Sequence, residues 1–480
     1  MIKTVLVPVL FIFTSFLSFP QRGISDWFLS DTSLKYASVS LRIADAVTGE
    51  TIAEHDSRRS LCQASVMKLI TTASALQLLG HDFRFETSVG IRGTLSEGSG
   101  ILKGNIIIKG GGDPCLGSER FPEYYEDFVE KWVDAIKSAG IRKVTGKVIT
   151  DDSYYDFEPV PDGWIWEDIG NYYGAGVYGL SVYDNTLKLH FITSGEGTKP
   201  VMTAMEPLYT GVELTNNLVS SGNTDQGYVY LAPYTQKGWI SGKVPANSED
   251  FILKASLPDP PLFMAVTLKE ALKKAGIIVN GQSSTARMSG QNNLKADKLL
   301  IKTYSPPLLL ILKTINHESV NLYAEHLVKE LGRRFGGSGS TDSGIKVIKA
   351  FLSRKSIDFA GMFMLDGSGL SPHNAVNART VTELLVSMRN DPDHFDQYYS
   401  TLPRAGKEGT LKNVFREEIF DGRMRVKSGS MDRVRSYAGY ITAMSGRELV
   451  FSIIINNYTG SSQDITRLIS GLLREVIMSY

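Results

Sequence analysis

The sequence predicts an α/β protein of the α+β kind, in which an antiparallel sheet is flanked by helices and smaller β-rich domains are inserted. Three observations lead to this prediction, two at the chain ends and one in the middle of the chain. An alternating segment is followed by a helical one within residues 38–79, and three strand-like segments are followed by an amphipathic helix within residues 423–479. In the third observation, short strands alternate with Gly- and Asp-rich loops over residues 86–298. The two ends therefore build one split domain, and the middle of the chain carries the insertions.

The composition limits the kind of protein. With 480 residues the chain exceeds a single ordinary core, so we expect two or three domains. Apolar residues make up 42% and charged residues 21% of the chain, as in soluble globular proteins. Lys and Arg together count 51, as do Asp and Glu, so no net field attracts nucleic acid or an anionic membrane. We expect no nucleic-acid partner and at most a peripheral membrane association.

The N-terminus begins with Lys3 and a mostly apolar segment, residues 5–19. Its length suits the core of a signal peptide and is short for a membrane span. We predict that residues 1–22 are a secretory signal removed on export. An uncleaved N-terminal anchor is the alternative, because the small-residue cleavage pattern is weak.

Two cysteines occur, Cys62 and Cys115. They are too few for a disulfide framework, and a chain of this length does not need one. One bridge in an oxidising compartment and two unpaired thiols both remain open.

The split domain begins with a β-hairpin, in which residues 38–44 alternate and residues 51–54 return after a turn. A helix follows over residues 64–79, with Gly80 as its stop. After the insertion we predict three helical segments, then three strands of which the last two form a hairpin, and a final helix. These segments are residues 308–331, 343–354, 380–389, 423–427, 437–443, 449–456 and 463–479.

The insertion divides into two parts. Strands such as residues 104–109 and amphipathic helices over residues 124–139 and 261–275 predict an α/β unit, whereas residues 172–250 are rich in Gly, Thr, Asn and Tyr and indicate an all-β unit. Beyond the signal segment we therefore predict a split domain of residues 23–85 and 299–480, an inserted α/β domain of residues 86–171 and 251–298, and a nested β-rich domain of residues 172–250.

Ser65 and Lys68 place a hydroxyl and an amine one helical turn apart on one face. Serine needs a nearby base to act as a nucleophile. Lys68 can serve if burial and a neighbouring cation, for which Lys427 is the candidate, lower its pKa. The start of the helix also favours developing negative charge at Ser65. A Ser-x-x-Lys pattern alone is common by chance, so the hypothesis depends on two later elements.

The second element is Ser319-Val320-Asn321. Residues at i and i+2 project together only from a loop or a helix start. We predict that Ser319 relays a proton between a lysine and the leaving group, while Asn321 holds the substrate amide. A structural alternative makes Ser319 the N-cap of a helix from residue 321, and the two roles are compatible.

The third element is Lys427-Ser428-Gly429-Ser430, on a predicted strand. Gly429 would let a substrate backbone approach as an added strand. Lys427, Ser428 and Ser430 could bind a terminal carboxylate, and the backbone N–H groups of Ser65 and Ser430 are candidates for an oxyanion hole. The alternative is a solvated lysine on an edge strand.

Taken together, these three elements, in this order, resemble those of the penicilloyl-serine transferases. Other segments are similar to signatures of the class C low-molecular-mass penicillin-binding proteins of the penicillin-binding protein 4 type, and the resemblance covers essentially the whole mature chain. The sequence departs from the family pattern with Ser428 where Thr is usual and Val320 where Asp is common. The similar segments are residues 111–114, 173–175, 366–371 and 409–411.

The resemblance implies a β-lactamase/transpeptidase-like catalytic domain, two nested insertions and a periplasmic location. It implies a serine D-Ala-D-Ala carboxypeptidase/endopeptidase that cleaves peptidoglycan stem peptides through an acyl-serine and is acylated by β-lactam antibiotics as inhibitors. A β-lactamase or esterase on the same scaffold and a non-catalytic wall-binding protein are the alternatives. The balance of carboxypeptidase and endopeptidase activity and the oligomeric state stay open.

We predict no metal and no cofactor. His317, Glu318 and His326 lack the spacing of a zinc-binding helix motif. The glycine run at residues 110–112 lacks the Gly-Lys-Ser/Thr of a phosphate-binding loop, so a tight turn is expected there. Residues 366–371 are expected to form a turn beside the catalytic cleft.

Overall fold

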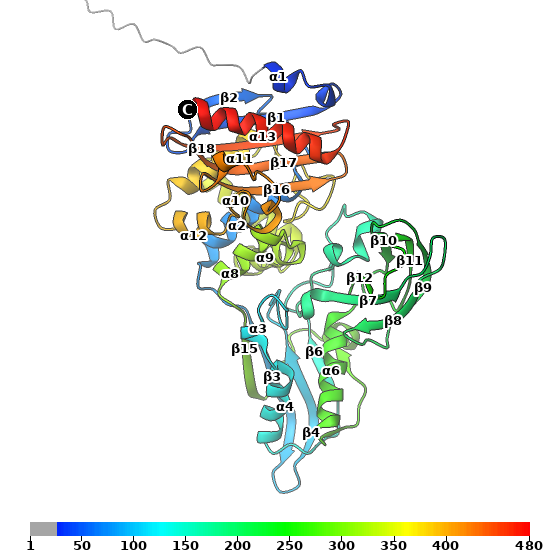
Figure 1. Ribbon diagram of the computed structural model, residues 1–480. Coiled ribbons are helices and arrows are strands. Elements are labelled where there is room, and N and C mark those ends of the chain that lie inside the picture. Colours follow the sequence, from blue (N-terminus) through cyan, green and yellow to red (C-terminus); the bar gives the residue numbers. More distant parts are fainter. Residues whose placement is uncertain (1–25) are drawn as a thin grey trace, which may run out of the picture.

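The computed structural model describes residues 26–480, so the predicted signal segment lies outside the described residues. A five-stranded sheet occupies one end of the molecule (Figure 1). Its strands run in the order β16-β17-β18-β1-β2, and each neighbouring pair is antiparallel. They are β1 (Ser38–Asp45), β2 (Thr51–His55), β16 (Met424–Met431), β17 (Val434–Thr442) and β18 (Glu448–Asn456). Because β1 pairs with β18, the two ends of the chain share one sheet, as the sequence predicts.

Alternate side chains of this sheet enter two separate apolar cores. On β18, Val450 and Ile454 belong to the larger core, whereas Phe451 and Ile453 belong to the smaller one. The smaller core is closed by α13 (Ser462–Ser479), which crosses the sheet in Figure 1. The other face carries helices of the larger core: α2 (Met67–Leu79), α8 (Leu308–Glu318), α9 (Asn321–Phe335), α10 (Thr341–Arg354), α11 (Ala378–Arg389) and α12 (Phe395–Ser400). The prediction of an antiparallel sheet flanked by helices is confirmed.

Two predicted helices are interrupted by residues with left-handed backbone. The segment predicted at residues 124–139 consists of α3 (Pro122–Tyr125) and α4 (Phe128–Ser138), separated at Asp127 with φ 51°. The segment at residues 308–331 divides into α8 and α9 at Ser319, with φ 61°. Hydrophobic spacing continues across such a single-residue break, which is why it does not register in the sequence pattern.

The insertion contains three further sheets. A seven-stranded sheet is covered by α4 and by α6 (Pro260–Lys274), and two three-stranded sheets form the nested part (Figure 1). The larger sheet comprises β3 (Glu86–Ser96), β4 (Ile101–Lys109), β5 (Lys143–Val144), β6 (Val148–Asp151), β13 (Ile278–Val279), β14 (Ser284–Thr285) and β15 (Lys298–Tyr304). The nested sheets comprise β7 (Thr186–Ile192), β8 (Val201–Glu206) and β12 (Phe251–Ser256), and β9 (Glu213–Ser220), β10 (Gln226–Tyr230) and β11 (Lys237–Val244).

Strand pairing moves two of the predicted domain boundaries. β12 pairs with β7, so residues 251–256 belong to a nested sheet and not to the surrounding inserted unit. β15 pairs with β3, so residues 299–304 belong to the inserted sheet and not to the split domain. Composition does not reveal which distant strand a segment will pair with, so the sequence does not locate either boundary.

Both cysteines are free thiols, Cys62 half-buried and Cys115 buried. The bridge that the sequence left open is therefore not formed. Among the described helices, none has the length and apolarity that a membrane crossing requires.

Candidate active site

Ser65 lies in a single 3-10 turn (Ala64–Val66) that leads directly into α2. Gly369 packs against this turn, and a Cβ at residue 369 would lie only 1.9 Å from the carbonyl oxygen of Ala64. Only glycine permits this approach, and it fixes the backbone that presents the Ser65 hydroxyl. The serine side of the predicted pair is thus placed at a helix start, as expected.

Lys68 is completely buried on the first turn of α2. Its Nζ lies 2.9 Å from Ser65 Oγ, 2.6 Å from Asn321 Oδ1 and 2.7 Å from the carbonyl oxygen of Ser368. Burial lowers the pKa of Lys68 to about 7, against the opposing charges of Glu325 and Asp366. At this pKa a large fraction of the amine is neutral near pH 7, so it can accept a proton from the serine.

Lys427 is also completely buried, on the edge strand β16. Its Nζ donates to Ser319 Oγ at 3.1 Å and to the carbonyl oxygen of Ser428 at 2.7 Å. Burial, and then the charge of Lys68, hold the pKa of Lys427 far below its ordinary value. The alternative of a solvated lysine is therefore wrong. Burial is the cause that lowers the pKa of Lys68; the contribution predicted from Lys427 is the reciprocal of this repulsion and stays a prediction.

Ser319 occupies the junction between α8 and α9 and does not cap α9. The N-cap of α9 is Val320, and no side chain caps this terminus. The left-handed backbone of Ser319 turns its hydroxyl toward Lys427. The N-cap alternative is therefore wrong, while the expected loop position at a helix start is correct.

Asn321 joins the two serine–lysine pairs to the inserted domain. Its Oδ1 accepts from Lys68, and its Nδ2 donates to the carbonyl oxygen of Tyr173 at 2.9 Å. In this structure the amide orients Lys68, a contact that its predicted role toward substrate did not include. Tyr173 belongs to one of the segments that carry the family resemblance, although no contact was predicted for it.

The strand β16 passes close to Ser65. A Cβ at residue 429 would lie 3.0 Å from the backbone nitrogen of Ser65 and 2.5 Å from the carbonyl oxygen of Gln63, so glycine is required there. Ser428 shares a hydrogen bond of 2.7 Å with Thr410, whose hydroxyl is a further polar group beside the strand. Ser430 is exposed and lines the cavity described below.

Two buried carboxyl groups, those of Glu325 and Asp366, fix the loop whose Ser368 carbonyl accepts a hydrogen bond from Lys68. Glu325 accepts from the backbone N–H groups of Gly367 and Ser368, at 2.9 and 2.7 Å. Asp366 accepts from Gly369 and Ser371 at 2.7 and 2.6 Å, and from the indole of Trp164 at 2.8 Å. The predicted turn at residues 366–371 is therefore built around these two acids.

Glu325 was not predicted as a functional residue. Burial and the neighbouring Asp366 raise its pKa to about 8. A sequence signal for it does exist, because Glu325 and Asn321 are four residues apart on α9 and so share one helix face.

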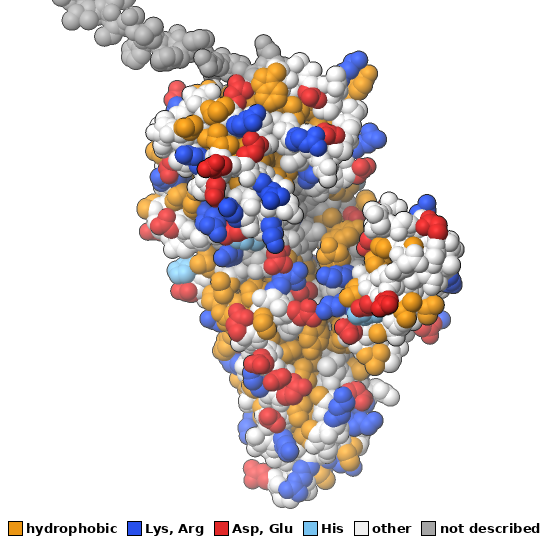
Figure 2. All heavy atoms as spheres, viewed as in Figure 1, with side chains coloured by type: hydrophobic (Ala, Val, Ile, Leu, Met, Phe, Trp, Pro, Cys, Tyr) orange, Lys and Arg blue, Asp and Glu red, His pale blue; other side chains and the backbone are white. Residues whose placement is uncertain are grey.

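A cavity of about 830 Å³ opens in front of these groups. Figure 2 shows the hollow between the catalytic part of the molecule and the nested domain. Its catalytic wall includes Ser65, Ser319, Asn321 and Ser430, whereas Lys68 and Lys427 lie behind it. The opposite wall comes from the insertion and includes Arg120, Glu167, Asp168, Tyr172, Tyr173, Asp184 and Tyr228.

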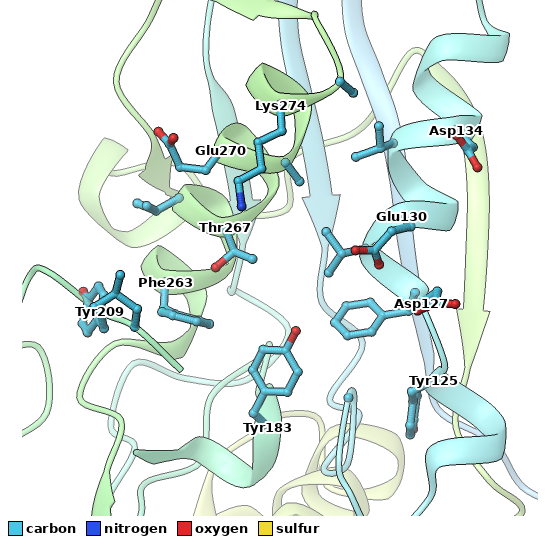
Figure 3. Close-up of a pocket in the computed structure, with 18 of the residues that line it drawn as sticks. Tyr125, Asp127, Glu130, Asp134, Tyr183, Tyr209, Phe263, Thr267, Glu270 and Lys274 are labelled. Carbon is cyan, nitrogen blue, oxygen red and sulfur yellow. The ribbon is translucent and has the colours of Figure 1, made fainter. Parts of the chain in front are cut away.

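A second cavity, of about 870 Å³, lies between α4 and α6 (Figure 3). It is lined by Tyr183, Phe263 and Tyr209, by Glu130 of α4 and by Glu270 of α6. None of the predicted site residues contributes to it. The predicted chemistry therefore belongs to the cavity beside Ser65.

A serine bonded to a buried lysine, with a second serine–lysine pair beside it and an antiparallel sheet flanked by helices, defines a β-lactamase/transpeptidase-like acyl-serine enzyme. The sequence profile of the D-Ala-D-Ala carboxypeptidase 3 (S13) family matches residues 24–476. The chain belongs to this family, and it is a serine-type D-Ala-D-Ala carboxypeptidase of the penicillin-binding kind.

Named relatives agree with this assignment. The chain is 29% identical over 451 residues to a D-alanyl-D-alanine carboxypeptidase of an Actinomadura species, which covers 91% of this chain and 80% of that protein. It is 24% identical over 435 residues to the D-alanyl-D-alanine carboxypeptidase DacB of Haemophilus influenzae, covering 87% and 85%. The crystal structure of penicillin binding protein 4 from Haemophilus influenzae shares the fold, with a TM-score of 0.79 at 22% identity over 92% of this chain and 97% of that chain.

Proposed function

We propose that Ser65 is the nucleophile and Lys68 its general base in cleaving peptidoglycan stem peptides, at D-Ala-D-Ala termini or at cross-links of D chirality. The contact that carries the proposal is the 2.9 Å separation of Lys68 Nζ from Ser65 Oγ, made by a buried amine whose pKa is about 7. A neutral Lys68 accepts the hydroxyl proton as Ser65 Oγ attacks the carbonyl carbon. Asn321 and the Ser368 carbonyl keep the amine aimed at Ser65.

The tetrahedral intermediate carries an oxyanion that needs preorganised donors. The backbone N–H groups of Ser65 and Ser430 are the proposed donors, because β16 runs close to Ser65 at Gly429. A substrate backbone that pairs with the edge strand β16 would bring its carbonyl to this position.

The leaving amine needs a proton when the C–N bond breaks. Ser319, bonded to Lys427, is the proposed relay from the lysines to that amine. Ser428 and Ser430 are the proposed binding groups for the terminal carboxylate of the substrate, with the Thr410 hydroxyl bonded to Ser428 as an additional member. Lys427 lies buried behind them, and its proposed contribution to carboxylate binding needs its amine to take up a proton as the anion binds. Water then attacks the acyl-Ser65 ester, and the carboxylic acid product leaves the regenerated serine.

β-Lactams present a similar amide and carboxylate, so we propose that they acylate Ser65. Their adducts are expected to be long-lived. Fast turnover of nitrocefin would favour the β-lactamase or esterase alternative. Peptidoglycan binding without release of D-alanine would favour the non-catalytic one.

Residues 1–22 have the character of a secretory signal, and the proposed substrate lies outside the cytoplasmic membrane. We therefore place the mature enzyme in the periplasm. Export of a fusion that carries this segment, followed by N-terminal sequencing of the product, tests the location.

The central test combines a fluorescent penicillin with D-alanine release from a soluble D-Ala-D-Ala peptide. Ser65→Ala is expected to abolish both labelling and release. Ser99→Ala, at an exposed serine in the turn between β3 and β4, is the matched control and is expected to behave as wild type. Equal labelling of Ser65→Ala and wild type would contradict the proposal. Incubation with cross-linked and uncross-linked muropeptides then divides endopeptidase from carboxypeptidase activity.

A further inference from the structure

The nested sheet β10-β11-β9 has one buried and one exposed face. Val229, Ile240 and Leu218 point inward and are at most 1% exposed. Side chains an odd number of positions from these residues therefore point outward. Besides Val219 and the charged Glu213, Lys237 and Lys243, they include Tyr228 and Tyr230 on β10, Trp239 and Ser241 on β11, and Thr215 and Asn217 on β9.

Four aromatic residues gather at one end of this outer face. Trp239 lies directly opposite Tyr230 across the strand pair, and their rings stack at 5.1 Å with 13° between planes. Trp166, on the short helix α5 (Trp166–Ile169), adds a third ring at 6.2 Å from both. Trp166 and Trp239 remain 45% and 41% exposed. We name Trp166, Tyr228, Tyr230 and Trp239 the aromatic ledge.

The ledge is rigidly supported. A Cβ at residue 170 would lie 1.9 Å from the carbonyl oxygen of Val229, so glycine lets the end of α5 press against β10. Asn171 accepts from the backbone nitrogen of Val229 at 3.1 Å and donates to the carbonyl oxygen of Glu167 at 2.6 Å. A surface held in this way loses little conformational entropy when it binds a ligand.

The ledge is continuous with the catalytic cavity. Tyr228 lines that cavity together with Ile165 and Tyr172, and Tyr230 follows Tyr228 on the same face of β10. In Figure 2 hydrophobic side chains border the hollow on the side of the nested domain. A polymer whose attached peptide enters the cavity would therefore pass over the ledge.

We propose that the aromatic ledge binds a glycan chain, the amino-sugar polymer to which stem peptides are attached. The apolar faces of pyranose rings stack on flat aromatic side chains, and their hydroxyl and acetamido groups need hydrogen-bonding partners at the side. Thr215, Asn217 and Ser241 offer uncharged amide and hydroxyl groups beside Trp239. At one end of this face Lys237 and Glu213 pair with each other at 3.5 Å, and Lys243 lies at the other end, opposite Gln226.

A hydrophobic protein partner fits this face less well, because it would bury the neighbouring amide and hydroxyls without hydrogen bonds. The inference rests on the proposed function, since the glycan carries the peptide substrate.

The test uses the full-length enzyme, peptide-free glycan strands and intact sacculi. Wild type is expected to bind the strands with a change in tryptophan fluorescence. Trp166→Ala/Trp239→Ala is expected to weaken binding by about tenfold or more, the equivalent of at least one lost stacking contact. Release of D-alanine from sacculi should fall by a similar factor at subsaturating substrate, while kcat/KM for a soluble D-Ala-D-Ala peptide stays within about twofold of wild type.

Two further variants keep the test decisive. Trp27→Ala removes a tryptophan that is 42% exposed on the catalytic domain and is expected to change neither activity. Thr215→Glu leaves the aromatic side chains in place and puts a negative charge beside Trp239. This variant is expected to lower glycan binding.

Failure of wild type to bind the strands would overturn the inference, as would unchanged binding in the double variant. Self-association through the ledge, seen by sedimentation and abolished in the double variant, would also overturn it. Loss of peptide cleavage by wild type would instead count against the proposed function, because strand binding is read without catalysis.

Discussion

Lys68 shows how the site sets the basicity of one amine through opposing effects. Burial disfavours the charged form and lowers its pKa, while Glu325 and Asp366 favour the charged form and raise it, and the balance lies at about 7. A base with this pKa is half neutral near physiological pH, which is close to the optimum for general base catalysis. Glu325 holds the backbone at Gly367 and Ser368. Its own pKa is about 8, so near pH 7 only a small part of it is ionised and its charge raises the pKa of Lys68 only weakly.

Glu325→Gln tests whether Glu325 is protonated when Lys68 titrates. In wild type, kcat/KM for a soluble D-Ala-D-Ala peptide is expected to fall as the pH drops through about 7, because Lys68 becomes protonated. Glutamine resembles the protonated form of Glu325, whose pKa of about 8 lies above that of Lys68. The acid limb is therefore expected to stay close to its wild-type position.

The control is Glu123→Gln, at an exposed carboxylate on α3, which is expected to leave the pH profile unchanged. An acid limb that moves to clearly lower pH in Glu325→Gln would mean that Glu325 is ionised beside Lys68, and would contradict this assignment. Circular dichroism of both variants checks that the fold is retained.

At the scale of elements, the junction of α8 and α9 places Ser319 by backbone conformation and not by capping. The spacing of Ser319 and Asn321 indicates a loop or a helix start, because i and i+2 do not share a helix face, although the hydrophobic pattern predicts one helical segment over residues 308–331. It does not predict the left-handed φ of 61°, which arises because the chain must turn between two packed helices. Lys427 and Lys68 likewise carry no local signal of complete burial, because both are covered by segments distant in sequence.

Ser319→Gly separates a catalytic role of this residue from a structural one. Glycine adopts the left-handed conformation without the roughly 1 kcal/mol penalty of other residues, so stability is expected to match or slightly exceed that of wild type. The hydroxyl relay is lost, so acylation by the peptide is expected to slow by about 100- to 10,000-fold, the range of a positioned proton-transfer group.

Ser319→Ala is the paired variant and keeps the strained backbone. It is expected to lose a similar factor in rate without the gain in stability. Rate constants come from single-turnover assays, and stability comes from urea denaturation. Near-wild-type acylation in both variants would remove Ser319 from the proposed mechanism.

At the scale of the whole molecule, the split sheet was predictable because its strands and helices lie near the chain ends in unbroken periodic segments. The pairing of β12 with β7 and of β15 with β3 was not, because register between distant strands depends on tertiary packing. The serine and lysine residues were identified by motif order. Their supports, Glu325 and the carbonyl of Tyr173, depend on how the insertion and α9 meet.

The chain enters and leaves the nested domain at neighbouring strand ends, so this domain can be deleted to test whether the catalytic cleft depends on it. Thr186 at the start of β7 lies opposite Ser256 at the end of β12. Antiparallel partners stand about 5 Å apart at their Cα atoms, so a two-residue Asn-Gly turn can join them. The contacts among Ser65, Lys68, Ser319 and Lys427 lie outside residues 187–255.

A variant in which Asn-Gly replaces residues 187–255 is therefore expected to fold. Its rate of labelling by fluorescent penicillin is expected to lie within about tenfold of the wild-type rate, a difference of about 1.4 kcal/mol. The loss of Tyr228 and the ledge is expected to remove glycan binding from the same variant. Calorimetry and labelling kinetics against full-length protein provide the comparison. A soluble, folded variant that resists penicillin would mean that the catalytic cleft requires the nested domain, and an unfolded one would mean that the nested sheets are part of a single cooperative fold.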